Sequence, residues 1–171
     1  GENGVIIPDD DYLSKVRDWC DENGLLLILD EIQTGIGRTG PLFAYEDAGI
    51  EPDIMTLAKG LGGGVPIGAV LAKEKASVFT TGDHGSTYGG NPLVCAVGFD
   101  TLRFILENGV LENVQQVGAY LMKQLRQMKL SFDSITDVRG RGLLCAIQFD
   151  REISGDLVQL CLENGLLING V

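Results

Sequence analysis

Residues 25–31 read LLLILDE, and residues 54–60 read IMTLAKG. Each stretch is a short, largely apolar run that ends in a charged side chain, Asp30 in the first and Lys59 in the second. Such runs are too short for a helix and are typical of strands that are buried on both faces. The sequence therefore predicts one buried strand in each stretch.

Helix and strand patterns alternate around these two runs. A helix is expected after Pro8, because the three aspartates that follow can cap free N–H groups, and Asn23-Gly24 ends it. Strands are expected over residues 25–29 and 54–58, and a third over residues 67–72. This alternation predicts an α/β fold with a mostly parallel sheet.

A long helix that begins at Asn91-Pro92 marks the end of the first domain. Asn caps this helix and Pro occupies its first position. Its body is apolar on most sides, so we expect it to be buried as far as Asn108. The composition changes at Gly109, and we predict a domain boundary there, with domains over residues 1–108 and 109–171.

The second domain is expected to combine helices with a small sheet, and it shows no internal repeat. Its expected elements are a surface helix with a one-sided apolar stripe (Val110, Val114, Val117, Leu121, Leu125 and Met128), a strand pair with tight glycine turns over residues 139–150, a helix over 156–163 and a strand that begins at 166–168.

The charge balance excludes one large class of partners. The chain has 171 residues, with 13 Lys and Arg against 24 Asp and Glu, which gives a net charge of −11. Nucleic-acid binders hold phosphates with clustered Lys and Arg, and this chain has no run of basic residues. We therefore expect small molecules or protein as partners, and no nucleic acid.

The cysteine and histidine patterns argue against a metal site. The four cysteines lie far apart, and His84 is the single histidine, so a structural zinc site is not expected. Each cysteine sits in an apolar stretch, which favours reduced core thiols in a cytoplasmic protein. No apolar run reaches the roughly 18 residues that a membrane span needs, so no membrane contact is expected.

Asp30 and Lys59 are the candidate reactive groups. Ligands of open parallel sheets bind beyond the carboxyl ends of the strands, where both residues are expected to stand. A partly desolvated lysine is easily deprotonated, as a Schiff-base nucleophile must be, and a nearby carboxylate would keep a pyridine nitrogen protonated for pyridoxal phosphate. On spacing alone a plainer alternative is favoured, in which Asp30 caps a turn and Lys59 is solvated.

Four motifs follow one another along the chain: LDEIQTG at residues 29–35, RTG at 38–40, LAKGLGGGVPIGA at 57–69 and HGSTYGGNPL at 84–93. Together they closely resemble the class III pyridoxal-phosphate-dependent aminotransferases, and the resemblance extends over essentially the whole chain. It implies part of the fold type I large domain, with a mostly parallel sheet, followed by part of an α+β C-terminal small domain.

The resemblance also implies roles in a pyridoxal 5′-phosphate site. Lys59 would bind the cofactor covalently and move a proton between substrate and cofactor. Asp30 would pair with the pyridinium nitrogen, and Gln33 would hydrogen-bond near the ring hydroxyl. Ser86 and Thr87 would contact the phosphate, in this family usually across the interface of a homodimer. A plain turn is the alternative for these two hydroxyls.

Three further residues carry weaker implications. Glu2 resembles the switch glutamate of the family, which masks a carboxylate-binding arginine when the substrate presents an amino group instead. That arginine would lie beyond Val171, and the alternative for Glu2 is a frayed terminal charge. Arg139 and Arg141 could reach a substrate carboxylate, although a structural ion pair is favoured.

For activity, the resemblance implies transfer of the δ-amino group of N-acetylornithine to 2-oxoglutarate by a ping-pong mechanism in arginine biosynthesis. Ornithine or another ω-amino donor is the alternative within the family. A non-catalytic interaction module is the alternative outside enzymes. Members of the family begin well before Gly1 and continue past Val171, so we expect this chain to be a piece of a longer enzyme that is inactive alone.

Overall fold

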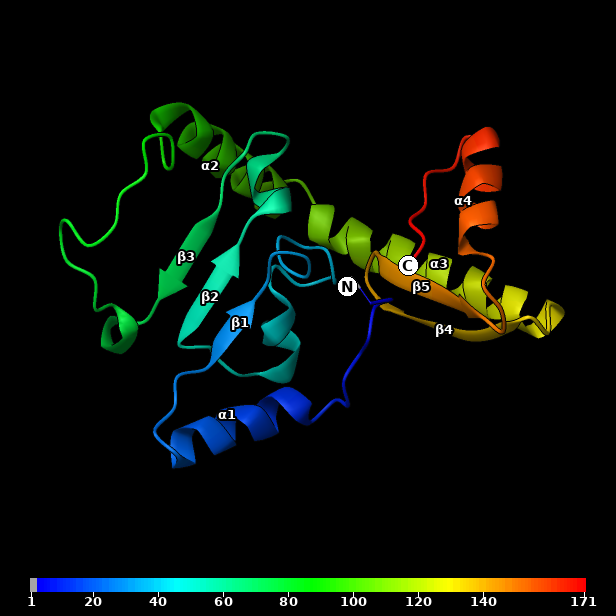
Figure 1. Cartoon of the computed structure of the whole chain (residues 1–171), viewed down its shortest axis with the longest axis horizontal. Coiled ribbons are helices and arrows are strands. Elements are labelled where there is room, and N and C mark those ends of the chain that lie inside the picture. The colour runs from blue at the N-terminus through cyan, green and yellow to red at the C-terminus, as the bar shows by residue number, and fades with distance from the viewer. Residues whose placement is uncertain (1–2) are drawn as a thin grey trace. The chain divides into compact units, whose positions relative to one another are not determined.

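The computed structural model describes residues 3–171, which divide into two compact units (Figure 1). The larger unit comprises residues 8–116, and the smaller unit joins the segment before Pro8 to residues 117–171. Helix α3 (Val110–Ser131) runs through the division. The domain boundary expected at Gly109 stays a prediction.

The sheet of the larger unit contains β1 (Ile28–Asp30), β2 (Ile54–Leu57) and β3 (Ala69–Ala72), in that order. β1 and β2 are parallel, as the sequence predicts. β3 departs from that expectation, because it runs antiparallel to β2. The connection over residues 58–68 contains only a 3₁₀ turn, η2 (Lys59–Gly62), and a connection of this kind reverses the chain direction more readily than it crosses over a sheet.

The helices of the larger unit begin and end close to the expected residues. α1 (Tyr12–Glu22) ends at Asn23, whose side-chain amide donates to the Trp19 carbonyl at 2.8 Å. α2 (Pro92–Glu107) begins after Asn91, whose side-chain oxygen accepts from the Val94 N–H at 3.2 Å. The N-terminal cap predicted for α2 is therefore confirmed.

The core of the larger unit lies between β2, η2 and α2. Its buried centre consists of Met55, Leu57 and Leu61. The half-buried side chains around this centre are Ile36, Phe43, Tyr45, Ile67, Ala69 and Leu102. The turn η2 that follows β2 is thus part of the core, because its Leu61 packs in the buried centre with Met55 and Leu57.

Burial is less complete than the apolar runs predict. Ile28 on β1 is 58% exposed, and Phe99 and Phe104 on α2 are 65% and 61% exposed. The expectation that α2 is buried on most sides is wrong for the described residues, where only Val94 and Gly98 of this helix are buried. An apolar face is buried only where another element packs on it, and η2 covers one face of α2.

The smaller unit contains an antiparallel strand pair, β4 (Ile135–Arg141) and β5 (Leu144–Phe149), and the helix α4 (Ser154–Glu163). The turn between the strands contains Gly142 at φ +54°, so the strand pair with a glycine turn is confirmed. Residues 166–168 form no strand, contrary to expectation. A strand needs a second strand beside it, and residues 166–168 pair with no strand among residues 3–171.

The described residues hold four free cysteines. Cys20 is buried, but Cys95 is exposed on α2 because that face of the helix is uncovered, so the expectation of core thiols is wrong at Cys95. No helix in residues 3–171 is long and apolar enough to cross a membrane. Over the same residues, no group of three or more His, Cys, Asp or Glu side chains is placed to hold a metal ion.

The apolar stripe predicted for α3 is confirmed in part. Val114 is buried and Val110, Leu121 and Leu125 are half-buried, whereas Val117 and Met128 are each 43% exposed, and Gly118 and Met122 are buried although the prediction did not include them. The helix approaches the β4–β5 turn closely at Gly118. A Cβ atom at this position would lie 2.7 Å from the carbonyl carbon of Gly142, which is too close for any side chain.

Gly118→Ala should therefore destabilise the protein by about 1–3 kcal/mol, because the added methyl group forces α3 away from Gly142. In an open helix the same change stabilises by about 1 kcal/mol. Gly155→Ala in α4 is the matched control, because its Cβ would meet no atom within 4 Å. Urea unfolding of both variants checks the prediction, and equal stabilities of the two would contradict it.

Candidate active site

The carboxyl ends of β1 and β2 carry the two ionisable residues that the sequence singles out. Asp30 is the last residue of β1 and lies opposite Thr56 of β2, and Lys59 follows β2 at the same edge because the strands are parallel. The structure therefore brings Asp30 and Lys59 to one edge of the sheet. No hydrogen bond or ion pair between their side chains is found within residues 3–171.

The Asp30 side chain is exposed, and one of its oxygens is already used. Oδ1 accepts a hydrogen bond from the Ile32 N–H at 2.9 Å, which is the turn cap considered as an alternative from the sequence. Oδ2 has no hydrogen bond from the described residues. Asp30 can therefore cap this turn and still present a charged oxygen to a ligand.

Lys59 stands on strained backbone. Its φ is +44°, a region that residues with a side chain rarely adopt. Ile36, in the loop after β1, has φ +56°, and its side chain lies against Gly60, where a Cβ atom would be 3.4 Å away. Strain of this kind persists only where the surrounding structure enforces it, and it clusters at functional sites. The exposed Lys59 ammonium has no ion pair among the described residues.

Glu31 organises the loop that follows β1, a role that the sequence pattern did not predict. Its side chain is 3% exposed and accepts hydrogen bonds from the Thr34 hydroxyl and from the Tyr45 N–H, the latter at 3.0 Å. Its own N–H donates to the Thr56 carbonyl at 3.0 Å. These bonds hold the loop that contains the half-buried Gln33 beside the end of β2. The only feature of the sequence that pointed to Glu31 was the acidic pair, Asp30-Glu31, at the end of LLLILDE.

Ser86 and Thr87 are exposed in the connection between η3 (Glu74–Ala76) and α2. The Ser86 hydroxyl oxygen accepts a hydrogen bond from the Gly89 N–H at 2.8 Å, which is the geometry of a turn. In the part of the chain that the structure describes, neither hydroxyl is bonded to Asp30 or Lys59. The phosphate role expected for these two residues therefore stays a prediction.

Of the three weaker candidates, Glu2 lies outside the described residues. In the smaller unit, Arg139 donates to the carbonyls of Gly4 and Val5 and to the Asp137 carboxylate at 2.8 Å. Its guanidinium holds the pKa of Asp137 below the ordinary value, chiefly through this side-chain hydrogen bond. The structural ion pair favoured for Arg139 from the sequence is confirmed.

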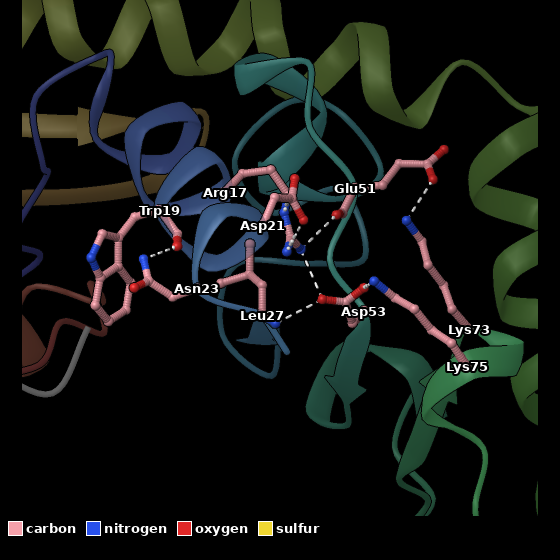
Figure 2. A network of polar contacts seen from close by, with 9 residues as sticks. All are labelled: Arg17, Trp19, Asp21, Asn23, Leu27, Glu51, Asp53, Lys73 and Lys75. Carbon is pink, nitrogen blue, oxygen red and sulfur yellow. Dashed lines mark hydrogen bonds and ion pairs between the residues drawn. The ribbon is translucent and has the colours of Figure 1, made fainter. Parts of the chain in front are cut away.

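A second polar cluster lies at the opposite end of β2 (Figure 2). Asp53, directly before β2, is 1% exposed. Its Oδ2 accepts from the Leu27 N–H at 2.8 Å and pairs with Arg17 at 2.9 Å, and its Oδ1 pairs with Lys75 at 2.6 Å. The ion pair with Lys75, followed by the hydrogen bonds from Leu27 and Arg17, holds the pKa of Asp53 well below its ordinary value against the opposing effect of burial.

An open polar pocket of about 460 Å³ adjoins this cluster, not the edge with Lys59. Charges of both signs line it, including the exposed pair of Lys73 and Glu51 at 2.9 Å. The sequence pattern indicated no role for Asp53. An acidic residue directly before a buried strand, with basic residues after the next strand, was the only local signal.

The side chains at the Asp30 and Lys59 edge fit a cofactor that carries an aldehyde and a basic ring nitrogen. An aldehyde needs an accessible amine that is not consumed by an ion pair, and Lys59 provides one. A ring nitrogen that must stay protonated needs a carboxylate with an available oxygen, and Asp30 provides it.

Comparison with known proteins gives one consistent family. The family model described as "Aminotransferase class-III" matches residues 1–171. The acetylornithine aminotransferase of Caldanaerobacter subterraneus subsp. tengcongensis is 51% identical over 171 residues, which are 100% of this chain and 44% of that protein. The acetylornithine aminotransferase of Methanothermobacter thermautotrophicus is 48% identical over 99% of this chain and 43% of its own length.

Solved structures of the same family share the fold. The ornithine aminotransferase of Plasmodium yoelii superposes with a TM-score of 0.95 at 40% identity, over 100% of this chain and 47% of that one. The acetylornithine aminotransferase of Elizabethkingia anophelis gives a TM-score of 0.94 at 38% identity, over 100% and 44%. The ornithine aminotransferase of Toxoplasma gondii, with partial occupancy of PLP at its active site, gives 0.94 at 39% identity, over 99% and 41%.

The Asp53 cluster makes stability depend on pH in a defined direction. Because the pKa of Asp53 is lowered by folding, its charge stabilises the native state above the unfolded pKa of about 4, and this contribution is lost as the pH falls below that value. Asp53→Asn should cost about 3 kcal/mol at pH 7, since Arg17 loses its buried partner. Urea unfolding from pH 7 to pH 3 should show the difference from wild type shrinking. A constant difference would contradict this prediction.

Proposed function

Because this chain belongs to the class-III aminotransferases, we propose that it supplies the lysine and carboxylate of a pyridoxal 5′-phosphate site that moves the δ-amino group of N-acetylornithine to 2-oxoglutarate. The product amino acid is glutamate, and the step belongs to arginine biosynthesis. The chain spans about 44% of the length of the curated relatives that it matches, so the proposal concerns the polypeptide that carries these residues.

The observation that carries the proposal is that Asp30 and Lys59 lie at the same carboxyl edge of two adjacent parallel strands. Asp30 ends β1, and Lys59 begins the strained turn after β2. Edges of this kind are where α/β sheets bind their ligands. Lys59 has no ion pair among the described residues, and Asp30 keeps one oxygen available. This arrangement favours a site for this cofactor over a role in capping a turn alone.

Each group has a distinct task in the proposed reaction. Pyridoxal phosphate, when bound, supplies the electron-withdrawing ring that acidifies the carbon bearing the amino group. Lys59 binds the cofactor and then holds and moves the proton at that carbon, so one amine serves as both nucleophile and base. Asp30 keeps the ring nitrogen protonated through its Oδ2, while its Oδ1 remains bonded to Ile32.

The remaining site residues have supporting roles in this proposal. Gln33 contacts the cofactor near the ring hydroxyl, from the loop that Glu31 fixes beside β2. Ser86 and Thr87 bind the phosphate of the cofactor that the neighbouring subunit of a homodimer holds. The exposure of both side chains agrees with this role. Glu2 distinguishes the amino end of one substrate from the carboxylate of the other.

The relatives support N-acetylornithine as the amino donor, since those that are 51% and 48% identical are acetylornithine aminotransferases. Ornithine is the second candidate. The ornithine aminotransferase of Plasmodium yoelii has the same fold over the whole chain at 40% identity. A cytoplasmic location and the division into a cofactor domain (1–108) and a small domain (109–171) belong to the same proposal, as does the inactivity of residues 1–171 alone.

Lys59→Ala in the natural polypeptide should reduce glutamate formation from N-acetylornithine by at least about 10⁴-fold, because the nucleophile and the base are lost together. Lys123→Ala, an exposed lysine on α3, is the control and should keep wild-type turnover. The same assay with ornithine in place of N-acetylornithine tests which amino donor is preferred. We expect the wild-type kcat/KM to be lower for ornithine. Turnover by Lys59→Ala within tenfold of wild type would exclude the proposed site.

Asp30→Asn separates the charge of this side chain from its turn-capping role. The amide oxygen can still accept from the Ile32 N–H, so the free energy of unfolding should change little. Loss of the charge should lower kcat by about 100-fold, because the proton on the ring nitrogen loses its partner. Stopped-flow measurement of deprotonation at the amine-bearing carbon checks this, and an unchanged rate would remove Asp30 from the site.

A further inference from the structure

The register between β1 and β2 is fixed at the end of the sheet opposite Lys59. Leu27, directly before β1, and Asp53, directly before β2, are bonded in both directions. The Asp53 N–H donates to the Leu27 carbonyl at 2.8 Å, and the Leu27 N–H donates to Oδ2 of Asp53 at 2.8 Å. The Ile54 N–H also donates to the Leu27 carbonyl, at 3.1 Å. Leu27 is therefore held opposite the start of β2.

This arrangement matters because β1 is only three residues long. A ladder of this length defines its own register weakly, and a slip by one residue turns every side chain to the opposite face. With Leu27 held, Ile28 pairs with Ile54, and Asp30 pairs with Thr56. The bond at Leu27 thus determines where Asp30 stands relative to the residues that lead to Lys59.

The carboxylate that makes this bond cannot rotate away. Asp53 is 1% exposed and is held from two further sides, by Arg17 of α1 and by Lys75 of η3 (Figure 2). Arg17 is itself fixed by Asp21 at 2.7 Å. Oδ2 accepts from both the Leu27 N–H and Arg17, whereas Oδ1 is held by the ion pair with Lys75 and accepts no hydrogen bond, so Oδ2 stays directed at the Leu27 N–H.

We propose that Asp53 is a positioning residue for the reaction, which sets the register of β1 on β2 and thereby the separation of Asp30 from Lys59. This proposal rests on the proposed function for its consequence, but the register itself does not depend on any ligand. A cluster that only stabilised the fold would act through its charges. A register clamp acts through the oxygen that accepts from Leu27.

Three variants separate these two roles in the natural polypeptide. Asp53→Ala removes the charge and the acceptor, whereas Asp53→Asn removes the charge and keeps an oxygen for the Leu27 N–H. Glu51→Gln is the matched control, because it breaks the neighbouring ion pair with Lys73 while its side chain makes no bond to β1. Each variant is compared with wild type at a temperature where all are folded.

Amide hydrogen exchange without cofactor reads the register directly. The Glu31 N–H donates to the Thr56 carbonyl at the far end of β1, so it reports on the pairing without touching Asp53. After correction for each variant's own free energy of unfolding, exchange at Glu31 should be about tenfold or more faster in Asp53→Ala than in wild type, and within about threefold of wild type in Asp53→Asn and Glu51→Gln. Unchanged exchange at Glu31 in folded Asp53→Ala would overturn the proposal.

Activity of the holoenzyme tests the consequence of this register for the reaction. We expect kcat to fall about 10- to 100-fold in Asp53→Ala, since small misplacement of reacting groups has effects of this size, and to recover in Asp53→Asn. Borohydride trapping of the cofactor on Lys59 should follow the same order. Equal losses in the Asn and Ala variants would mean that charge alone matters, and would also overturn the proposal.

If Asp53→Ala does not fold, Lys75→Gln replaces it, because it removes one charge partner of Asp53 and leaves both the Arg17 pair and the Leu27 bond in place. That variant should keep wild-type exchange at Glu31, and faster exchange would overturn the proposal. Failure of the proposed function looks different, since wild type itself would then show neither trapping at Lys59 nor turnover. The exchange measurement would still decide the register.

Discussion

The buried carboxylate of Asp53 is the constraint on which the arrangement of the larger unit depends. A charge that is 1% exposed is tolerated only when it is fully paired, and its partners here come from three separate segments. Asp53 forms ion pairs with Arg17 of α1 and Lys75 of η3, and it accepts a hydrogen bond from the Leu27 N–H directly before β1. Losing any one of them leaves an uncompensated group in the interior, so these elements are held together as a set.

The candidate site lies at the other end of the same two strands, where the backbone is strained. Lys59 and Ile36 both have positive φ, and the Ile36 side chain lies against Gly60. Such conformations are costly, and they persist because η2 and the loop after β1 pack into the core around Leu57 and Leu61. One end of the pair β1–β2 is therefore rigidly paired, and the other presents reactive groups on turns.

Local pattern predicted those parts of the fold that depend on neighbouring residues. The parallel pair β1–β2, the Asn91 cap of α2 and the glycine turn of β4–β5 follow from apolar runs, capping chemistry and turn residues. The pattern failed where a contact between distant segments decides the outcome. β3 runs antiparallel, Phe99 is exposed, and α3 turns Gly118 rather than Val117 inward, because burial follows the packing partner and not the apolar run.

The same division applies to the candidate site. The sequence by itself determined that Asp30 and Lys59 stand at the ends of two strands, Asp30 as the last residue of β1 and Lys59 just after β2, since each follows a short apolar run. The order of four motifs around them determined the family. Only the tertiary structure decided that Glu31 fixes the loop after β1 and that Asp53 fixes the strand register. The partners of Glu31 are Tyr45 and Thr56, up to 25 residues away. The partners of Asp53 are Arg17, Leu27 and Lys75, up to 36 residues away. Periodicity reports which face of an element is apolar, and it carries no information about which distant group will meet a buried charge.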